Sequence, residues 1–335
     1  MDTEHKQQET PVKKPKRYFS YNGDGWELFK ITLVNSLLSA LTLGFYYPWA
    51  KAKLLSYHYS ETEFIGSRFS FHGTGKEMFK GFIKAILIFG GIIGGMIAVN
   101  LLMQNAIING ESVIAYMLIY FGLYFLFLAL IPLAIVGSAK YRAARSSFRG
   151  IHFKYIGTKK TMIGIFLKGI FLSIITFGIY AHWFQANIFR ELAKNTRLGN
   201  IKFRFDGSGG DLFALRLVDG LLMGITFGIY AFKHQSNLHQ YYFNNLKLEQ
   251  GELRGTLEAE TTGMGYFKLI FINGLIVIFT LGLGTPWALI RHMKYIAETT
   301  RFKGKIDFDN IEQGEIDPTD ATDEGIFDML DIDIA

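Results

Sequence analysis

One pattern of apolar and polar positions occurs four times along the chain. Each copy is a long apolar run that ends in Thr-[Leu/Phe]-Gly and continues into an aromatic-rich segment, and the breaks begin at Thr42, Thr176, Thr226 and Thr280. Repetition at this scale indicates a chain assembled from similar structural units. Because about twenty apolar residues suffice to cross ~30 Å of hydrocarbon, the pattern predicts an array of membrane-inserted units.

Six segments are apolar enough to be candidate membrane helices. The clearest is Val113–Gly137, 25 residues without a charged side chain, followed by Ala85–Met103, which only Asn100 interrupts. The others are Ile31–Ala50, Met162–Phe184, Leu212–Phe232 and Leu269–Ile290. Such hydropathy is typical of transmembrane helices. We therefore predict an all-α polytopic membrane protein with about six hydrophobic helices in repeated units.

A second repeated element, Phe-x-[Phe/Tyr]-x-Gly-x-Gly, lies between the apolar runs. Copies begin at Phe19, Phe69 and Phe203, and the copy at Phe153 lacks the second glycine. Alternation of aromatic and polar residues has period two and predicts short strands, here paired into β-hairpins between the helices. The basic amphipathic segments after the Thr-x-Gly breaks are expected to be helices in the lipid headgroup layer.

The two repeated elements divide the chain into similar units between two polar tails. We expect a basic tail over residues 1–17, a membrane domain over 18–304, and an acidic tail over 305–335. Within the membrane domain, the expected units lie near 18–66, 67–150, 151–199, 200–251 and 252–304.

Two sequence blocks carry a resemblance to a known family. They are Phe71-His72-Gly73-Thr74-Gly75-Lys76-Glu77 and the run from Asn35 to Lys51, which contains Thr-Leu-Gly-x-Tyr-x-Pro-Trp. With the repeated hairpins, they resemble the YjgN / DUF898 family of bacterial inner-membrane proteins of uncharacterised function, over roughly residues 18–304. The resemblance implies a multi-pass protein of the bacterial inner (cytoplasmic) membrane and no established activity. The unit around Thr226 departs from the pattern, since Lys233 stands where tryptophan is expected.

Composition and charge agree with membrane insertion. Of the 335 residues 50% are hydrophobic and 16% aromatic, and the absence of cysteine excludes disulfides and thiolate metal sites. The net charge of +6 is segregated, because residues 305–335 hold eleven acidic residues and only Lys305, a net charge of −10. The basic remainder predicts contact with lipid headgroups and no role in nucleic acid binding. The acidic tail is expected to be solvated, or to dock on the basic face or on a protein partner.

The orientation of the units stays open at this stage. If all six apolar segments cross the membrane, Lys and Arg fall almost evenly on its two sides, so the positive-inside rule gives no orientation. Similar units in both orientations, as in the inverted repeats of transporters, would explain the balance. Re-entrant units, which break at the glycine and return to the same face, would explain it equally well.

Four polar residues inside the apolar runs are the candidate intramembrane site. Asp219 and Arg216 lie at i, i+3 on one predicted helix, and Asn35 and Asn273 match Asp219 in lying seven residues before their Thr-x-Gly break. A charge in hydrocarbon costs at least ~2.5 kcal/mol and often marks a pathway or binding site. These groups either converge on a shared cavity or form interhelical hydrogen bonds that hold the helices together.

The glycine turns and the tryptophans give two further sets of candidates. Free backbone N–H groups at helix N-termini bind phosphate, so the turns are candidate lipid-phosphate contacts, although a tight turn before a helix explains them too; they comprise Gly73, Gly75, Lys76, Gly207 and Gly209. Tryptophans at the edges of apolar runs are typical interfacial anchors, here Trp49, Trp183 and Trp287.

No motif in the sequence indicates catalysis. Nucleotide-binding, hydrolase and metal-binding signatures are absent, so we expect no enzyme activity, no cofactor and no metal site. Gly90, Gly91, Gly94 and Gly95 form two Gly-x-x-x-Gly pairs, which favour close helix packing within the chain or in a homo-oligomer. The function expected first is transport or passage of a small solute or lipid. The alternative is a membrane-organising scaffold that binds lipid headgroups and protein partners.

Overall fold

The computed structural model describes residues 18–313, which fold into five successive β-α-α-β units. The first unit comprises β1 (Phe19–Tyr21), α1 (Gly25–Leu41), α2 (Tyr47–Glu61) and β2 (Thr62–Phe64). The second comprises β3 (Ser67–Phe71), α3 (Gly75–Ile108), α4 (Ile114–Arg145) and β4 (Ser146–Phe148). The expected tail over 1–17 and residues 314–335 of the expected acidic tail lie outside the described residues.

The remaining three units repeat the plan of the first. The third comprises β5 (Ile151–Tyr155), α5 (Lys159–Ile175), α6 (Ala181–Asn195) and β6 (Thr196–Leu198). The fourth comprises β7 (Ile201–Phe205), α7 (Gly209–Ile225), α8 (Ala231–Asn244) and β8 (Leu246–Gln250). The fifth comprises β9 (Leu253–Ala259), α9 (Gly263–Phe279), α10 (Thr285–Thr299) and β10 (Thr300–Gly304).

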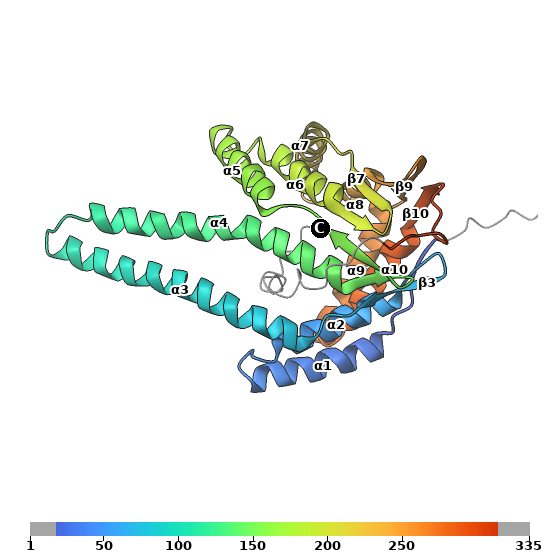
Figure 1. The fold of residues 1–335 in the computed structure, drawn as a ribbon, viewed down its shortest axis with the longest axis horizontal. Coiled ribbons are helices and arrows are strands. Elements are labelled where there is room, and N and C mark those ends of the chain that lie inside the picture. Colours follow the sequence, from blue (N-terminus) through green and yellow to red (C-terminus); the bar gives the residue numbers. More distant parts are fainter. Residues whose placement is uncertain (1–17, 314–335) are drawn as a thin grey trace, which may run out of the picture.

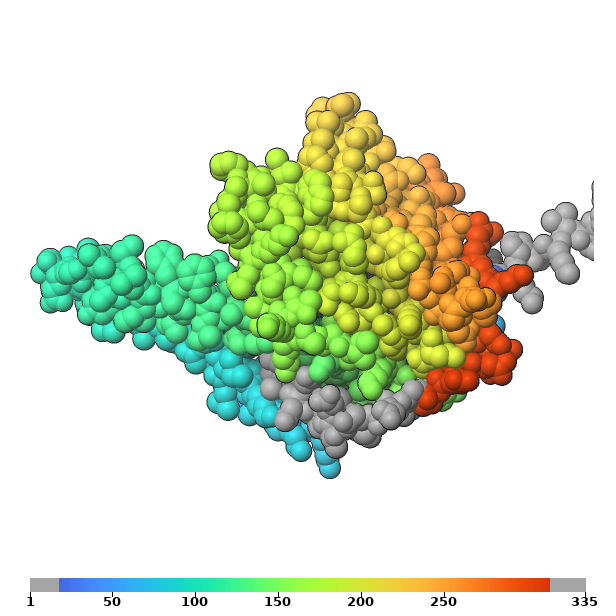
Figure 2. Space-filling model, turned by 45° about the horizontal axis from the view of Figure 1, so that its top comes forward, coloured from blue at the N-terminus to red at the C-terminus, as the bar shows by residue number. Residues whose placement is uncertain are grey.

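The all-α, six-span architecture expected from hydropathy is wrong. Four of the six apolar segments are not single helices, because the chain reverses at each Thr-x-Gly break and forms two arms of 14 to 17 residues. Two helices between residues 18 and 313, α3 and α4, are long and apolar enough to cross a membrane. They form a hairpin that projects far beyond the rest of the molecule (Figure 1; Figure 2).

The strands form one sheet instead of separate hairpins. In the described part of the chain, ten strands pair antiparallel in sequence order from β1 to β10. Two-residue turns join consecutive units, as at Ile65-Gly66 between the paired Phe64 and Ser67. The strands lie together at one end of the molecule, at the right in Figure 1. Each unit therefore begins and ends on the same sheet.

The sheet curls so that its two edge strands approach each other. Among the described strands, β1 and β10 have no ladder pairing to each other, yet the rings of Tyr18 and Phe302 meet edge to face with centroids 5.9 Å apart. The inward face carries the apolar member of each period-two pattern, and the last strand of each unit adds one residue to a shared core: Phe64, Phe148, Leu198, Leu248 and Phe302. The outer face is polar, with Arg68, Lys154 and Lys202 exposed.

The helices form a closed ring. Each helix from α1 to α9 packs against the next, and α10 packs back against α1. The second helix of each unit also covers the first strand of the following unit, and α10 covers β1 in the same way. Apolar residues of these second helices, such as Ala52 against Phe71, bury the inner face of the sheet. The amphipathic helices expected in the headgroup layer are therefore part of the protein core.

Candidate functional site

The four Thr-x-Gly turns have one geometry and form the tips of the short hairpins. At the first tip, the N–H of Gly44 donates to the carbonyl of Ser39 at 2.7 Å, which is the long bond of a Schellman motif. Thr42 Oγ1 donates to the carbonyl of Leu38 at 2.7 Å and accepts from the N–H of Tyr46 at 2.9 Å. One threonine thus joins the end of α1 to the start of α2, which explains its place in the pattern.

A large apolar residue occupies the left-handed conformation at every tip. Leu43 has φ 50° and the equivalent Phe177, Phe227 and Leu281 have φ 49° to 51°. Glycine is the usual residue there, because a side chain costs roughly 1–2 kcal/mol in this conformation. These four side chains are also 90%, 98%, 97% and 93% exposed. Because the tip side chains have so little contact with the described chain, packing does not offset the strain, and the tips present apolar groups to the surroundings.

In α1, α3 and α9 an exposed lysine lies at the same level of the helix, whereas the exposed Lys168 of α5 lies four positions further along. Lys30, Lys80 and Lys268 each occupy the sixth position of their helix and are exposed. The eleven residues that follow Lys30 in α1 extend about 16 Å, roughly half of the ~30 Å hydrocarbon core. On the second arms the polar surface returns soon after the tip, with exposed Lys53, Lys233 and Arg291.

Three of the four polar residues predicted inside the apolar runs, Asn35, Asn273 and Asp219, form hydrogen bonds within their own hairpin. Asn35 Nδ2 donates to the carbonyl of Ala50 at 3.3 Å, and Asn273 Nδ2 donates to the carbonyl of Ala288 at 3.0 Å. Both partners lie fifteen residues further along the chain, on the facing arm. In the third unit the place is taken by Gly169, where a Cβ would lie 2.1 Å from the Phe184 ring. The position is therefore a contact between the two arms in every short hairpin.

Asp219 is as buried as Asn35, each residue 3% exposed, and its carboxylate has two side-chain partners. Its Oδ2 lies 2.9 Å from His234 Nδ1, and both oxygens lie 3.0–3.1 Å from Asn237 Nδ2. His234 again lies fifteen residues on. No hydrogen bond or ion pair within residues 18–313 joins Asp219 to Arg216, although their spacing predicted a pair. The arrangement ties α7 to α8 through one buried carboxylate.

The tryptophans predicted as interfacial anchors pack on the glycine turns of neighbouring units. A Cβ on Gly75 would lie 2.3 Å from Trp49 Cδ1, and one on Gly209 would lie 2.4 Å from Trp183 Cγ. Trp287 occupies the same place over Gly25. Placement of these rings at a membrane border stays a prediction.

A signal for these contacts was present in the sequence but was missed. In the glycine turn between strand and helix, the second glycine is replaced only in the third unit, by Lys159. The helix that precedes this turn, α4, has no tryptophan that would pack there. Gly263 follows the unit in which Lys233 replaces tryptophan, and a Cβ there would lie 3.0 Å from Lys233 Cβ. The glycine thus accompanies every tryptophan at this place and is lost where α4 has none, whereas Gly263 is kept beside Lys233.

The glycine turns also have side chains that cap the helices that follow. The N-cap residues Thr74 and Ser208 accept from the backbone N–H three residues on, at 3.3 and 3.0 Å. The first glycine of each turn makes room for an aromatic ring, since a Cβ on Gly73 or Gly207 would lie 2.5–2.6 Å from Phe71 or Phe205. Lys76 is exposed beside the first of these turns. Binding of lipid phosphate at these turns stays a prediction.

The α3–α4 hairpin carries an apolar groove and an open glycine face. A groove of about 440 Å³ lies between α3 and α4, lined by residues such as Ile97, Asn100 and Tyr124. Of the four glycines with Gly-x-x-x-Gly spacing, Gly95 faces Leu123, whereas Gly90, Gly91 and Gly94 have nothing in the described chain within 4 Å of an added Cβ. No group of three or more metal-ligating side chains occurs among residues 18–313.

Comparisons with known proteins place this architecture in a bacterial context. A family model described as "Bacterial protein of unknown function (DUF898)" matches residues 16–206 and 234–329. The chain is similar to the inner membrane protein YjgN of Salmonella typhimurium, with 31% identity over 135 residues, 40% of this chain and 30% of that protein. No solved structure matches the chain.

Two Escherichia coli proteins give further matches. The inner membrane protein YjgN of strain O157:H7 is 27% identical over 164 residues, 48% of this chain and 36% of the relative. That of strain K12 is 43% identical over 65 residues, 19% of this chain and 16% of the relative. The chain thus covers little more than a third, at most, of the length of these relatives.

Proposed function

This chain belongs to the DUF898 family and is an inner-membrane protein, and on that premise we propose that it organises the bilayer by inserting four helical hairpins into one leaflet. The α3–α4 hairpin spans the membrane and anchors the protein, and the short hairpins enter from the side on which the sheet lies. The observation that carries the proposal is the set of four exposed apolar tip residues held in the left-handed conformation.

The hydrocarbon of the bilayer gives the tip side chains the apolar surroundings that the protein does not provide. A fully exposed leucine or phenylalanine gains about 1.5–3 kcal/mol when it is transferred from water to an apolar environment, which offsets the strain of its backbone. The tip glycines, such as Gly44 at φ 89°, have open space around them, so the turns are not shaped by packing against the rest of the chain. Insertion of the tips into hydrocarbon accounts for both features.

The arm lengths support insertion into a single leaflet. About 16 Å of helix lies beyond the lysine level on α1, about half the thickness of the hydrocarbon core. An unpaired backbone group in hydrocarbon costs several kcal/mol, so a turn at this depth requires local hydrogen-bond partners, which Thr42 and the Schellman bonds supply. Both arms of each hairpin return to the same sheet, so the inserted volume lies on one side of the bilayer. Apolar elements inserted at one interface make a protein sensitive to membrane curvature.

Cysteine labelling tests the insertion directly, because the chain has no native cysteine. Single cysteines replace Leu43, Phe177, Phe227 or Leu281, with Ser70→Cys on the sheet and Glu111→Cys in the α3–α4 loop as references for the two sides. A membrane-impermeant maleimide is expected to label Ser70→Cys and Glu111→Cys from opposite sides, and the tips from neither side until detergent is added. Labelling of the tips from the Glu111 side would refute one-leaflet insertion.

A reconstitution experiment tests the consequence for the membrane. Wild-type protein is expected to reduce the diameter of vesicles of bacterial phospholipid, as seen by electron microscopy, and a variant with glycine at all four tips is expected to lose the effect. A matched control removes exposed apolar groups from the spanning hairpin instead, by Leu87→Ala, Ile97→Ala, Leu118→Ala and Phe125→Ala. The control should behave as wild type. Equal activity of the tip variant would contradict the proposal.

Transport remains a second candidate because of the cluster around Asp219. A buried carboxylate that accepts from a histidine and an asparagine is the chemistry of a proton- or cation-coupled site as well as of a helix contact. A transport role requires that Asp219→Asn abolish solute uptake by reconstituted vesicles at unchanged protein abundance. Loss of abundance together with uptake would identify a structural contact.

A further inference from the structure

The chain continues past β10 and crosses the end of the sheet where the two-residue turns lie. Residues 306–313 pair with no strand, yet Phe308 is only 7% exposed and belongs to the sheet's core. Ile306 and Ile311 pack against the same core from either side. We name residues 305–313 the strap, because they lie across the sheet end without joining the sheet.

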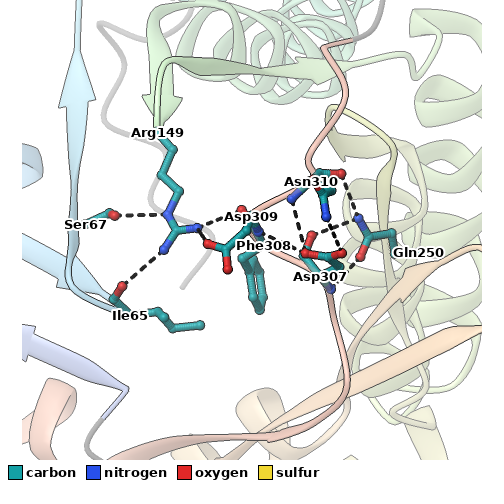
Figure 3. A network of polar contacts seen from close by, with 8 residues as sticks. All are labelled: Ile65, Ser67, Arg149, Gln250, Asp307, Phe308, Asp309 and Asn310. Carbon is teal, nitrogen blue, oxygen red and sulfur yellow. Dashed lines mark hydrogen bonds and ion pairs between the residues drawn. The ribbon is translucent and has the colours of Figure 1, made fainter.

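A buried glutamine from the fourth unit holds the backbone of the strap. Gln250 Nε2 donates to the carbonyl of Asp307 at 3.0 Å, and Gln250 Oε1 accepts from the N–H of the same residue at 2.7 Å. The Gln250 side chain also reaches the carbonyl of Asn310 at 3.5 Å (Figure 3). Asp307 in turn accepts from the N–H groups of Asp309 and Asn310, which fixes a compact turn.

An arginine from the second unit holds the other side of the strap. Arg149 Nη1 donates to the carbonyl of Phe308 at 2.8 Å and pairs with the carboxylate of Asp309 (Figure 3). The same guanidinium donates to Ser67 Oγ and to the carbonyl of Ile65 at 3.0 and 3.3 Å, so partners outside the strap also hold it. Arg149 itself has φ 52° in the two-residue turn between β4 and β5, as Ile65 has φ 47° at the equivalent place between β2 and β3.

The strap lies where β1 and β10 meet, the place in the described part of the sheet that has no ladder pairing. Phe308 meets Phe64 on the β1 side with ring centroids 5.1 Å apart, and Phe302 on the β10 side at 5.4 Å. Its far end reaches the third unit, where Gln313 Oε1 accepts from the N–H of His152 and Gly199 leaves room for the Glu312 carbonyl. One short segment therefore contacts all five units and closes the seam between β1 and β10.

We propose that the turn end of the sheet is a docking site for a short peptide with the core Asp-Phe-Asp-Asn, which the chain's own strap occupies, and that emptying the site opens the β1–β10 seam. The ligand chemistry follows from the contacts. An aromatic ring fills the gap between Phe64 and Phe302, a carboxylate pairs with Arg149, and a backbone amide and carbonyl meet the two ends of the Gln250 amide. The proposal does not depend on the membrane role of the hairpins.

Cleavage of the folded full-length protein tests whether the strap is held as a ligand. A specific protease site is inserted between Gly304 and Lys305, and the protein is cut after purification in detergent. The released segment is expected to stay with the body on size exclusion and to be displaced by excess synthetic peptide 305–313. A peptide with Phe308→Ala should displace it at least tenfold less well. Immediate loss of the segment after cleavage, or displacement by both peptides alike, would overturn the proposal.

Variants of the uncut chain give a second measurement that needs no cleavage. Arg149→Gln and Gln250→Ala are expected to speed amide hydrogen exchange in residues 306–311 at least tenfold, while exchange in α3 stays unchanged. Arg68→Gln is the matched control, because Arg68 pairs with Glu61 at 3.5 Å and does not contact the strap. Exchange that is equal in all four proteins would contradict a docked strap.

Opening of the seam is measured with spin labels at Ser20→Cys and Arg301→Cys, on β1 and β10. Arg149→Gln is expected to lengthen the distance between the labels, and added peptide 305–313 to restore it. If neither Arg149→Gln nor added peptide alters the distance between the labels, the strap does not control the seam. A dimer that exchanges straps between two copies would show that the occupant is not the chain's own segment.

Discussion

The indole of Trp287 lies directly over Gly25, so the last helix of the fifth unit interlocks with the first helix of the first. A Cβ on Gly25 would lie 2.3 Å from Trp287 Cδ1, and the ring also meets Phe29 with centroids 5.4 Å apart. The same contact joins Trp49 to Gly75 and Trp183 to Gly209. Closure of the ring of helices therefore uses the contact that joins neighbouring units elsewhere.

Filling this space is expected to destabilise the protein. Gly25→Ala should lower the free energy of unfolding by about 1–3 kcal/mol, because the indole must move to admit the methyl group. Gly90→Ala is the control, since a Cβ there meets nothing in the described chain within 4 Å and alanine is favoured in a helix interior. Circular dichroism during thermal unfolding in detergent measures both. An unchanged melting temperature for Gly25→Ala would show that Trp287 is not locked in place.

Relief of the tip strain should separate stability from membrane action. Leu43→Gly is expected to raise stability in detergent by about 1 kcal/mol, because glycine adopts the left-handed conformation without steric cost. Gly44→Ala, at φ 89°, should lower it. Denaturant unfolding of the purified proteins gives the comparison. If Leu43→Gly is the less stable protein, the leucine contributes packing that the exposed tip does not suggest.

The Asp219 cluster is expected to be a strong contact between α7 and α8. Asp219→Ala leaves the donors of His234 and Asn237 without their acceptor and should cost about 2–3 kcal/mol. Asp219→Asn should cost less, because asparagine serves at the equivalent Asn35 and Asn273. A double-mutant cycle with His234→Ala should give a coupling of about 1–2 kcal/mol. Additive effects would mean that the two residues do not interact.

His239 predicts a loss of stability in mild acid. Its ring stacks on Phe243 and Nδ1 lies 3.0 Å from the Tyr266 hydroxyl; burial, with a smaller contribution from His292, lowers the pKa of His239 to about 4. The unfolded chain, with a histidine pKa of about 6.5, binds the proton first, so stability is present above that pH and declines as the pH falls to about 4. Unfolding between pH 7 and 4 should show this slope in wild type and a smaller one in His239→Gln. Identical slopes would assign the acid sensitivity to other groups.

Hydropathy identified the apolar segments but could not show where they reverse. Leu43 and Phe45 are apolar, so the run from Ile31 to Ala50 reads as one helix although the chain turns at its centre. The reversal is a backbone property of Thr42 to Gly44, and no hydrophobicity scale measures it. The re-entrant alternative that the sequence left open describes this hairpin geometry.

The sheet and the strap depend on contacts between residues far apart in sequence. The alternation in Phe69 to Phe71 predicts a strand but not that β3 pairs with β4, which follows two long helices later. The polar residues inside the apolar runs also depend on such contacts. The sequence shows how far Asn35 lies from its Thr-x-Gly break, but it does not show that Ala50 is its hydrogen-bond partner. From the sequence, Arg149 is interpreted only as part of a glycine turn. Nothing near it in the sequence indicates that it forms an ion pair with Asp309.

The meeting of the first and last units, with Tyr18 against Phe302, has a consequence for how the gene could be rearranged. In a closed ring of similar units, any unit can come first in the chain. A circular permutant that joins the old termini by a flexible linker and starts at Gly66 or Gly251 should therefore adopt the same fold. The order in which the five units are synthesised then reflects evolutionary history, and the closed ring fixes their number.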